Sequence, residues 1–245
     1  MTLFLASVRD KAEAETALLA HADIVDLKEP ANGALGALDC ATTRSIVSFV
    51  GGRVPVSATV GDLPVQPEVI RDAVLEKAAC GVDYVKFGLF PGGDPRGCLA
   101  ALRPVARRTP LIVVVFADRR PDFDAVAAAA SFGAAGIMLD TADKSGGSLR
   151  AHLNRREIAR FVVDAKSRGL MVGLAGSLTA SDVPELLPFA AHVVGFRGAL
   201  CRGGRSATLD LADCAAIRAL IPRHHTSAES GPKARLSGTA VQALC

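Results

Sequence analysis

The chain has 245 residues, half of them hydrophobic, which is enough to bury one large core within a single domain. Its formal net charge of +3, with one Tyr and no Trp, excludes the basic and aromatic surface of a nucleic-acid-binding protein. The six cysteines show no CxxC spacing and the five histidines no HxH or HExxH arrangement, so the sequence predicts neither a disulfide framework nor a zinc site.

The same features predict a reduced, cytoplasmic protein that uses no metal and no other cofactor. The N-terminus lacks the basic and then apolar pattern of a signal peptide. The longest apolar stretch, residues 125–139, is interrupted by Gly133 and Gly136, which is typical of a helix end, a turn and a strand. We therefore expect neither a membrane nor a nucleic acid as a partner.

Short β-branched runs alternate with Ala-rich amphipathic stretches along the chain. The expected strands are residues 3–8, 24–28, 54–60, 84–89, 111–117, 136–141, 171–176 and 192–198. The expected helices lie near residues 10–20, 41–50, 67–80, 95–107, 122–132, 154–168, 179–188 and 209–220. Alternating units of this kind predict parallel strands with right-handed crossovers, and eight of them predict an α/β protein with a closed (β/α)8 TIM barrel.

We expect the barrel to occupy residues 1–222 as one domain. The alternative is an open doubly wound sheet, which usually carries a glycine fingerprint after its first strand, and residues 7–14 (SVRDKAEA) contain none. Residues 223–245 are polar, rich in small side chains and without periodicity, so the sequence predicts a disordered C-terminal tail.

Charged side chains end several of the expected strands. Asp26 and Lys28 are two residues apart and share one face of their strand, whereas the neighbouring apolar residues occupy the other face. Lys86 interrupts an apolar strand, and Asp140 ends another with Lys144 just beyond it. Barrel active sites lie at these C-terminal strand ends, so all five residues are predicted to be catalytic.

The lysines are the informative members of this cluster. Most basic residues of the chain are arginines, which stay protonated and are not amine nucleophiles. Burial and a neighbouring cation both lower the pKa of a lysine, and nearby carboxylates can move the protons of carbinolamine, imine and enamine. The cluster therefore predicts Schiff-base chemistry, and its alternative is a set of charges on a solvated rim.

Two glycine-rich segments, residues 174–178 (LAGSL) and 195–204 (GFRGALCRGG), follow the seventh and eighth strands. Barrels commonly bind phosphate there through backbone N–H groups, although such glycines also occur in ordinary turns. Arg197, Arg202 and Arg205 could add charge-assisted hydrogen bonds. Hydroxyl side chains in the third strand could orient a polyol or phosphate, or support a turn. The expected substrate- or phosphate-binding residues are Ser57, Thr59, Gly176, Ser177, Arg197, Gly198, Gly203 and Gly204.

Six motifs together resemble one known family. They are DLKEP (26–30), VSATVGD (56–62), YVKFGL (84–89), MLDTADKSG (138–146), LAGS (174–177) and VGFRGALCRGG (194–204). In this order they are similar to (5-formylfuran-3-yl)methyl phosphate synthase, also called 4-(hydroxymethyl)-2-furancarboxaldehyde-phosphate synthase. The resemblance covers about residues 2–220.

This resemblance implies the condensation of two glyceraldehyde 3-phosphate molecules into a phosphorylated furan aldehyde, the precursor of methanofuran, with loss of phosphate and water. Lys28 matches the Schiff-base lysine of the family, and Asp26, Lys86, Asp140 and Lys144 match its other catalytic positions. The resemblance also implies a small phosphorylated sugar as the ligand and makes a homo-oligomer the expected assembly.

Two other functions remain open at this point. A class I aldolase or a transaldolase-like enzyme would share the Schiff base but release an aldol product without inorganic phosphate. A non-catalytic sugar-phosphate sensor would use the lysines for anion binding alone. The positions of Asp26 and Asp140 among these lysines count against the sensor, because carboxylates repel an anionic ligand.

Overall fold

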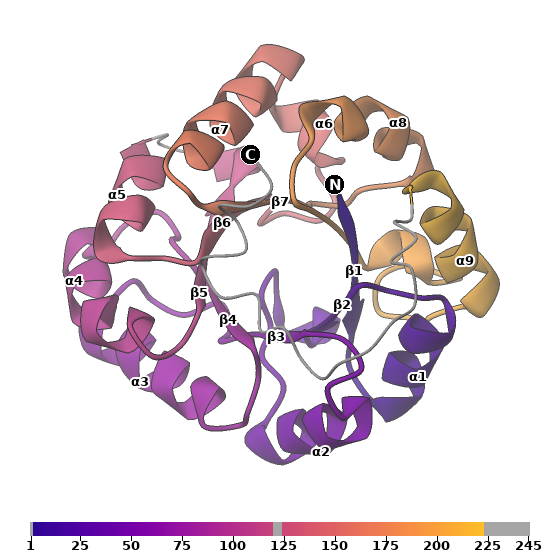
Figure 1. Ribbon diagram of the computed structural model, residues 1–245, viewed down its shortest axis with the longest axis horizontal. Helices are drawn as coiled ribbons and strands as arrows, with labels where there is room; N and C mark the ends of the chain where they lie inside the picture. Colours follow the sequence, from indigo (N-terminus) through magenta and orange to yellow (C-terminus); the bar gives the residue numbers. More distant parts are fainter. Residues whose placement is uncertain (1, 120–123, 223–245) are drawn as a thin grey trace, which may run out of the picture.

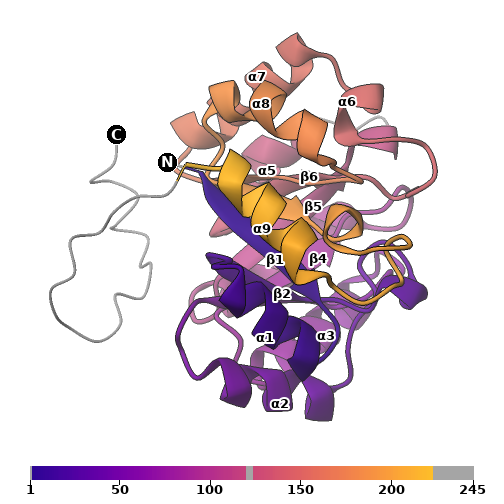
Figure 2. The same ribbon diagram turned by 90° about the vertical axis from the view of Figure 1, so that its right-hand side faces the viewer.

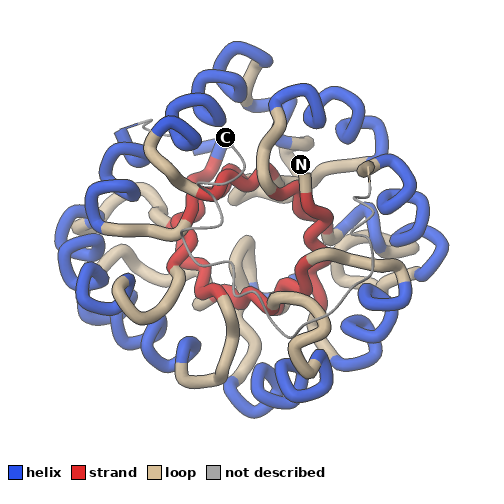
Figure 3. Tube along the Cα trace, viewed as in Figure 1, coloured by secondary structure: helices blue, strands red, loops and turns tan. Residues whose placement is uncertain are grey.

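The computed structural model describes residues 2–119 and 124–222, and within them a closed eight-stranded parallel barrel. Figure 1 looks down the barrel, with the strands as an inner ring and the helices outside them, and Figure 3 shows the same two layers by colour. The strands are β1 (Leu3–Val8), β2 (Ile24–Leu27), β3 (Val56–Thr59), β4 (Tyr84–Gly88), β5 (Leu111–Phe116), β6 (Gly136–Asp140), β7 (Met171–Leu174) and β8 (Val193–Phe196). The predicted TIM barrel is confirmed.

The helices return the chain from the C-terminal end of each strand to the start of the next strand. They are α1 (Lys11–Leu19), α2 (Cys40–Val50), α3 (Pro67–Ala78), α4 (Pro95–Ala106), α5 (Asp124–Phe132), α6 (Leu149–His152), α7 (Arg155–Ser167), α8 (Val183–Leu186) and α9 (Leu211–Leu220). Figure 2 gives the side view, in which α1 and α9 lie next to each other and cover β1.

Helix caps fix the loops at the end of the barrel where the helices begin. The Asp10 carboxylate accepts a hydrogen bond from the backbone N–H of Glu13 at the start of α1, and Asp39 accepts one from Thr42 at the start of α2, both at 2.8 Å. Asn154 and Glu157 form a reciprocal capping box at the start of α7. Each cap satisfies N–H groups that a helix leaves without an internal partner, so the loop before the helix is held in place.

The barrel interior is built in two layers with different chemistry. The lower layer is an apolar cluster that includes Leu5, Tyr84, Ile112 and Met138. One pleat further along the strands the inward side chains become polar, and Asp26 is the register partner of both Ser7 in β1 and Ser57 in β3. A separate outer core fills the space between the sheet and the helices. The polar layer therefore lies inside the barrel, on an apolar floor.

One predicted helix differs from the observed structure. Instead of a continuous helix over residues 179–188, the chain forms a 3-10 turn at Ala180–Asp182, the short helix α8, and a second 3-10 turn at Leu187–Phe189. Pro188 has no N–H to continue the α-helical hydrogen bonds, which explains why α8 stops after one turn. The short helix α6 was not predicted. The predicted tail, residues 223–245, lies outside the described residues, as do residues 120–123 of the predicted helix 122–132.

Candidate active site

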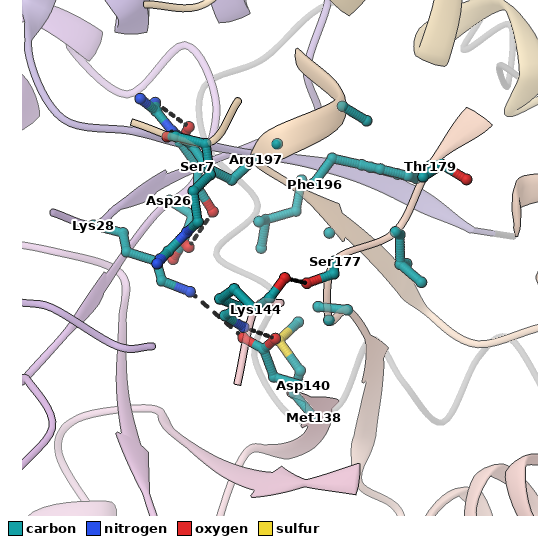
Figure 4. A pocket seen from close by; sticks show the side chains of 18 of the residues that line it. Ser7, Asp26, Lys28, Met138, Asp140, Lys144, Ser177, Thr179, Phe196 and Arg197 are labelled. Carbon is teal, nitrogen blue, oxygen red and sulfur yellow. Dashed lines mark hydrogen bonds and ion pairs between the residues drawn. The ribbon is translucent and has the colours of Figure 1, made fainter. Parts of the chain in front are cut away.

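A cavity of about 370 Å³ opens inside the C-terminal end of the barrel. All five predicted catalytic residues line it, together with Ser7 and the loops that follow β7 and β8. Figure 4 shows that Lys28, Asp140 and Lys144 point toward one another, although they come from β6 and from the loops after β2 and β6. The structure thus brings together side chains that are up to 118 positions apart in the sequence, from Asp26 to Lys144.

Asp26 is the centre of the deeper half of the site. Its side chain is 1% exposed, and its Oδ1 lies 2.6 Å from Nζ of Lys86. The hydroxyl of Ser57 donates to the same oxygen at 2.6 Å, and the hydroxyl of Ser7 donates to Oδ2 at 2.9 Å. These contacts hold the carboxylate and the Lys86 ammonium in one orientation, as buried charges require.

Asp140 is the centre of the outer half of the site. Its Oδ1 accepts hydrogen bonds from Nζ of Lys144 at 2.6 Å and from the backbone N–H of Thr141 at 2.7 Å. Its Oδ2 lies 3.5 Å from Nζ of Lys28. Burial alone would raise the pKa of Asp140, but the two ammonium groups and these hydrogen bonds outweigh burial and hold the pKa well below its usual range.

Of the three lysines in the cluster, Lys28 forms the longest ion-pair contact. Its contact with Asp140 is 3.5 Å long, whereas Lys86 and Lys144 each lie 2.6 Å from a carboxylate oxygen. The pKa of Lys28 is lowered from 10.5 to about 8, chiefly by burial and also by the cations of Lys144 and Lys86, while Asp140 and Asp26 act in the opposite direction. A neutral amine is therefore accessible at Lys28 near physiological pH.

Two aspartates outside the cluster fix the loops that carry it. The Asp118 carboxylate, after β5, accepts hydrogen bonds from the backbone N–H groups of Ala142 and Asp143, both at 2.7 Å. These two residues immediately precede Lys144. After β3, Asp62 accepts from two backbone N–H groups of the loop that follows Lys28, at 2.7 and 2.6 Å. No role was predicted for Asp118 from the sequence, because its contacts with the loop after β6 depend on the fold.

The glycine-rich loops form the wall of the cavity on the β7 and β8 side. Gly176, Ser177, Gly198 and Gly204 all line the cavity, whereas Gly203 is not among its lining residues. Gly176 has φ +106°, and a Cβ at this position would lie 2.9 Å from the backbone nitrogen of Thr141. The loop after β7 therefore needs glycine to approach the loop of β6 this closely.

Two predicted phosphate-binding side chains make their contacts within the protein. The Arg197 guanidinium forms a forked ion pair with Glu13 and donates to backbone oxygens, including those of Ser7 at 3.1 Å and Ala207 at 2.8 Å. The Thr59 hydroxyl donates to the carbonyl oxygen of Gly36 at 3.0 Å and does not line the cavity. In this arrangement Arg197 lines the cavity with its charge already compensated, and Thr59 braces the loop after β2.

Sequence reasoning missed Glu13, which is 0% exposed and compensates Arg197. The available signal was its position one turn before Ala17 on the buried face of α1, where a carboxylate needs a partner. The apolar lining residues Leu5, Met138 and Phe196 were also missed, because apolar strand residues look alike whether they face the helices or the cavity. Among the described residues, no helix combines the length and apolar character needed to cross a bilayer.

Comparison with known proteins identifies the family of this chain. The family model of 4-HFC-P synthase matches residues 4–218. A Methanopyrus kandleri protein named (5-formylfuran-3-yl)methyl phosphate synthase is 38% identical over 214 residues, covering 82% of this chain and 90% of that protein. A Methanocaldococcus jannaschii protein with the same name is 35% identical over 214 residues, covering 82% and 91%.

Among solved structures, phosphoribosyl anthranilate isomerase from Thermus thermophilus superposes with a TM-score of 0.64 and 17% identity, covering 90% of this chain and 98% of that chain. At this identity the likeness concerns the barrel fold alone. The family match spans the barrel and includes every residue of the lysine and aspartate cluster. The chain therefore belongs to the 4-HFC-P synthase family.

Proposed function

We propose that this barrel condenses two molecules of glyceraldehyde 3-phosphate into (5-formylfuran-3-yl)methyl phosphate for methanofuran synthesis, through an imine on Lys28, with loss of phosphate and water. The observation that carries the proposal is the buried Lys28 amine, whose pKa is lowered to about 8 beside two further lysines and two carboxylates. The names of the relatives support the product, and the cluster supports the reaction class.

In the proposed scheme one triose phosphate first isomerises to its ketone form. The aldehyde carbon of the other triose phosphate bonds to Nζ of Lys28, and loss of water from the carbinolamine gives the imine. Removal of a proton from C2 of this imine gives an enamine that expels inorganic phosphate from C3, and C3 of the resulting enol attacks the ketone carbon of the first triose phosphate. The free primary hydroxyl of the ketone-derived half closes the ring onto the C2 carbonyl, loss of two waters gives the aromatic furan, and hydrolysis of the imine releases the aldehyde and regenerates Lys28.

The carboxylates and the other lysines serve as the proton-transfer groups of this scheme. Asp140 contacts both Lys28 and Lys144, so a proton can pass from the attacking amine to a second amine through one carboxylate. Asp26 and Lys86 form the matching pair in the deeper half of the cavity. Together these two pairs supply the acids and bases for the proton transfers of the scheme.

Phosphate binding is assigned to the loops after β7 and β8. Gly176, Ser177, Gly198 and Gly204 line the cavity there, and small residues let a phosphate approach the backbone closely. Ser57 supports Asp26, and we propose the same supporting role for Thr59 and Arg197 through their contacts with loop backbone. A homo-oligomeric assembly stays a prediction.

Replacing Lys28 tests the covalent scheme. Lys28→Arg keeps a cation but removes the nucleophilic amine, so we expect the furan absorbance and the released phosphate both to disappear. Lys28→Met serves as a second variant without the larger guanidinium. The matched control is Lys166→Arg on α7, which should keep wild-type turnover. The Nζ of Lys166 donates to the Ala190 carbonyl oxygen and does not line the cavity.

The product assay also separates the proposal from its alternatives. An aldol product without inorganic phosphate would indicate a class I aldolase or transaldolase-like enzyme. Binding of triose phosphate without turnover would indicate a sensor. Wild-type rates in folded Lys28→Arg, judged by an unchanged melting temperature, would contradict the Lys28 imine.

A further inference from the structure

Five cationic side chains line the cavity, and they differ in whether a carboxylate compensates them. Lys28 and Lys144 share Asp140, Lys86 pairs with Asp26, and Arg197 pairs with Glu13. The fifth, Arg205, forms no ion pair with any carboxylate in the described parts of the chain. Its charge is therefore available to an anionic ligand, whereas the other four are engaged before any ligand arrives.

Arg205 reaches across one side of the cavity mouth. It lies in the loop after β8, and its Nη2 donates to the carbonyl oxygen of Gly33, in the loop after β2, at 3.0 Å. A guanidinium has five N–H groups, and within residues 2–119 and 124–222 this is the single protein acceptor found for them. Burial lowers the pKa of Arg205, and Asp140 is the charge that most strongly opposes this effect. Arg205 lines the same cavity as the lysine and aspartate cluster.

The two neighbouring arginines differ from Arg205 because carboxylates already compensate their charges. Arg202, three residues earlier in the same loop, is 71% exposed at its side chain and pairs with Asp210 at 3.1 Å. Arg197 has its guanidinium fork filled by Glu13 and backbone oxygens. From the sequence, all three could form charge-assisted hydrogen bonds, but only Arg197 was among the expected phosphate-binding residues. The structure instead leaves Arg205 with open donors beside the cavity.

The proposed reaction brings two phosphate groups into one cavity. The loops on the β7 and β8 side accommodate one phosphate, and the open donors of Arg205 lie displaced from them, toward Gly33 and β2. A planar fork that can donate two parallel hydrogen bonds suits a phosphate better than a point charge does. Resting on the proposed function, we propose that Arg205 binds the phosphate of the ketone triose phosphate, the acceptor attacked by the Lys28-bound enol, and so selects for a phosphorylated acceptor.

The test compares acceptors with and without phosphate. Glyceraldehyde 3-phosphate is supplied as the donor, with dihydroxyacetone phosphate or dihydroxyacetone as the acceptor, and carbon–carbon bond formation is followed by chromatography that separates the phosphorylated from the unphosphorylated product. The wild-type protein should prefer the phosphorylated acceptor in kcat/KM. In Arg205→Gln this preference should fall by about 10- to 100-fold, the range expected for one or two charge-assisted hydrogen bonds. Arg205→Lys, with charge but no fork, should lie between the two.

Arg202→Gln is the matched control, since it removes an arginine from the same loop outside the cavity, and its acceptor preference should equal that of the wild type. Borohydride trapping of glyceraldehyde 3-phosphate on Lys28 should reach the same extent at the same donor concentration in Arg205→Gln, because the donor does not use Arg205. Melting temperatures show whether each variant folds. If Arg205→Gln does not fold, the comparison of Arg205→Lys with the wild type serves as the test.

The outcomes separate this inference from the proposed function. If the wild type forms no adduct on Lys28, the proposed function fails. If the adduct forms and folded Arg205→Gln keeps the full preference for the phosphorylated acceptor, the assignment of Arg205 is overturned while the chemistry stands. Loss of adduct formation in step with condensation would place Arg205 on the donor and would also overturn the assignment.

Discussion

Lys28 and Lys86 are both buried lysines beside carboxylates, but their contacts suit them to different work. Lys86 is held at 2.6 Å by an aspartate that also accepts hydrogen bonds from two serine hydroxyls. Lys28 has a single contact at 3.5 Å and a pKa lowered to about 8. A loosely held amine loses its proton at a smaller cost, so Lys28 is the better nucleophile and Lys86 the better fixed cation.

The pH dependence of adduct formation tests this difference. Because the attacking species is the neutral amine, the rate of imine formation at low substrate should rise about tenfold per pH unit below pH 8 and level off above it. The rate is measured by stopping the reaction with borohydride at timed intervals across the pH range. A profile that keeps rising to the pKa of an ordinary lysine, about 10.4, would contradict the account.

At the scale of elements, the Glu13 and Arg197 pair joins helix α1 to the end of strand β8. Strands β1 and β8 close the barrel, so this pair fastens the seam between the first and last units of the fold. Arg197 also donates to the Ser7 carbonyl oxygen in β1. The pair is nearly inaccessible to solvent, with side-chain exposures of 7% for Arg197 and 0% for Glu13.

Replacing Glu13 should therefore destabilise the whole barrel. Glu13→Gln leaves the Arg197 guanidinium buried without a carboxylate, which costs about 3–5 kcal/mol in the free energy of unfolding. Urea denaturation followed by circular dichroism measures the change. Glu185→Gln is the control, because the Glu185 side chain is 45% exposed and pairs with Arg155, which is 60% exposed, and it should change stability by less than about 1 kcal/mol. Equal effects of the two substitutions on stability would contradict the view that the Glu13 and Arg197 pair holds the first and last units of the barrel together.

The elements also show which structural features could be predicted from sequence. The short β-branched runs in the sequence were sufficient to predict every strand, because a strand that is buried on both faces is apolar along most of its length. The helix predicted at residues 179–188 was wrong, since two prolines in that segment interrupt the helical hydrogen bonds. Glu13 and Arg197 could not be paired from sequence, because they are 184 positions apart and come together only when the barrel closes.

At the scale of the whole molecule, closure of the barrel brings the C-terminal ends of strands that are far apart in the sequence together into one site. Asp26, Lys28, Lys86, Asp140 and Lys144 were predicted to meet because the C-terminal ends of parallel strands share one face of the barrel, and the cavity contains all five. Sequence could not predict the orientation of each side chain inside the cavity. Thus Arg197 was among the expected binding residues and Arg205 was not, and only the folded contacts show that Glu13 compensates Arg197 whereas Arg205 has open donors.

The central claim is that Lys28 forms an imine with a triose phosphate. The most direct measurement is to incubate the wild-type protein with glyceraldehyde 3-phosphate, reduce with borohydride, and map the modified peptide by mass spectrometry. The account predicts a reduced triose-phosphate adduct on the peptide that contains Lys28, at the pH where the untreated sample releases phosphate. An adduct on Lys86 or Lys144 instead, or turnover with no adduct at all, would contradict it.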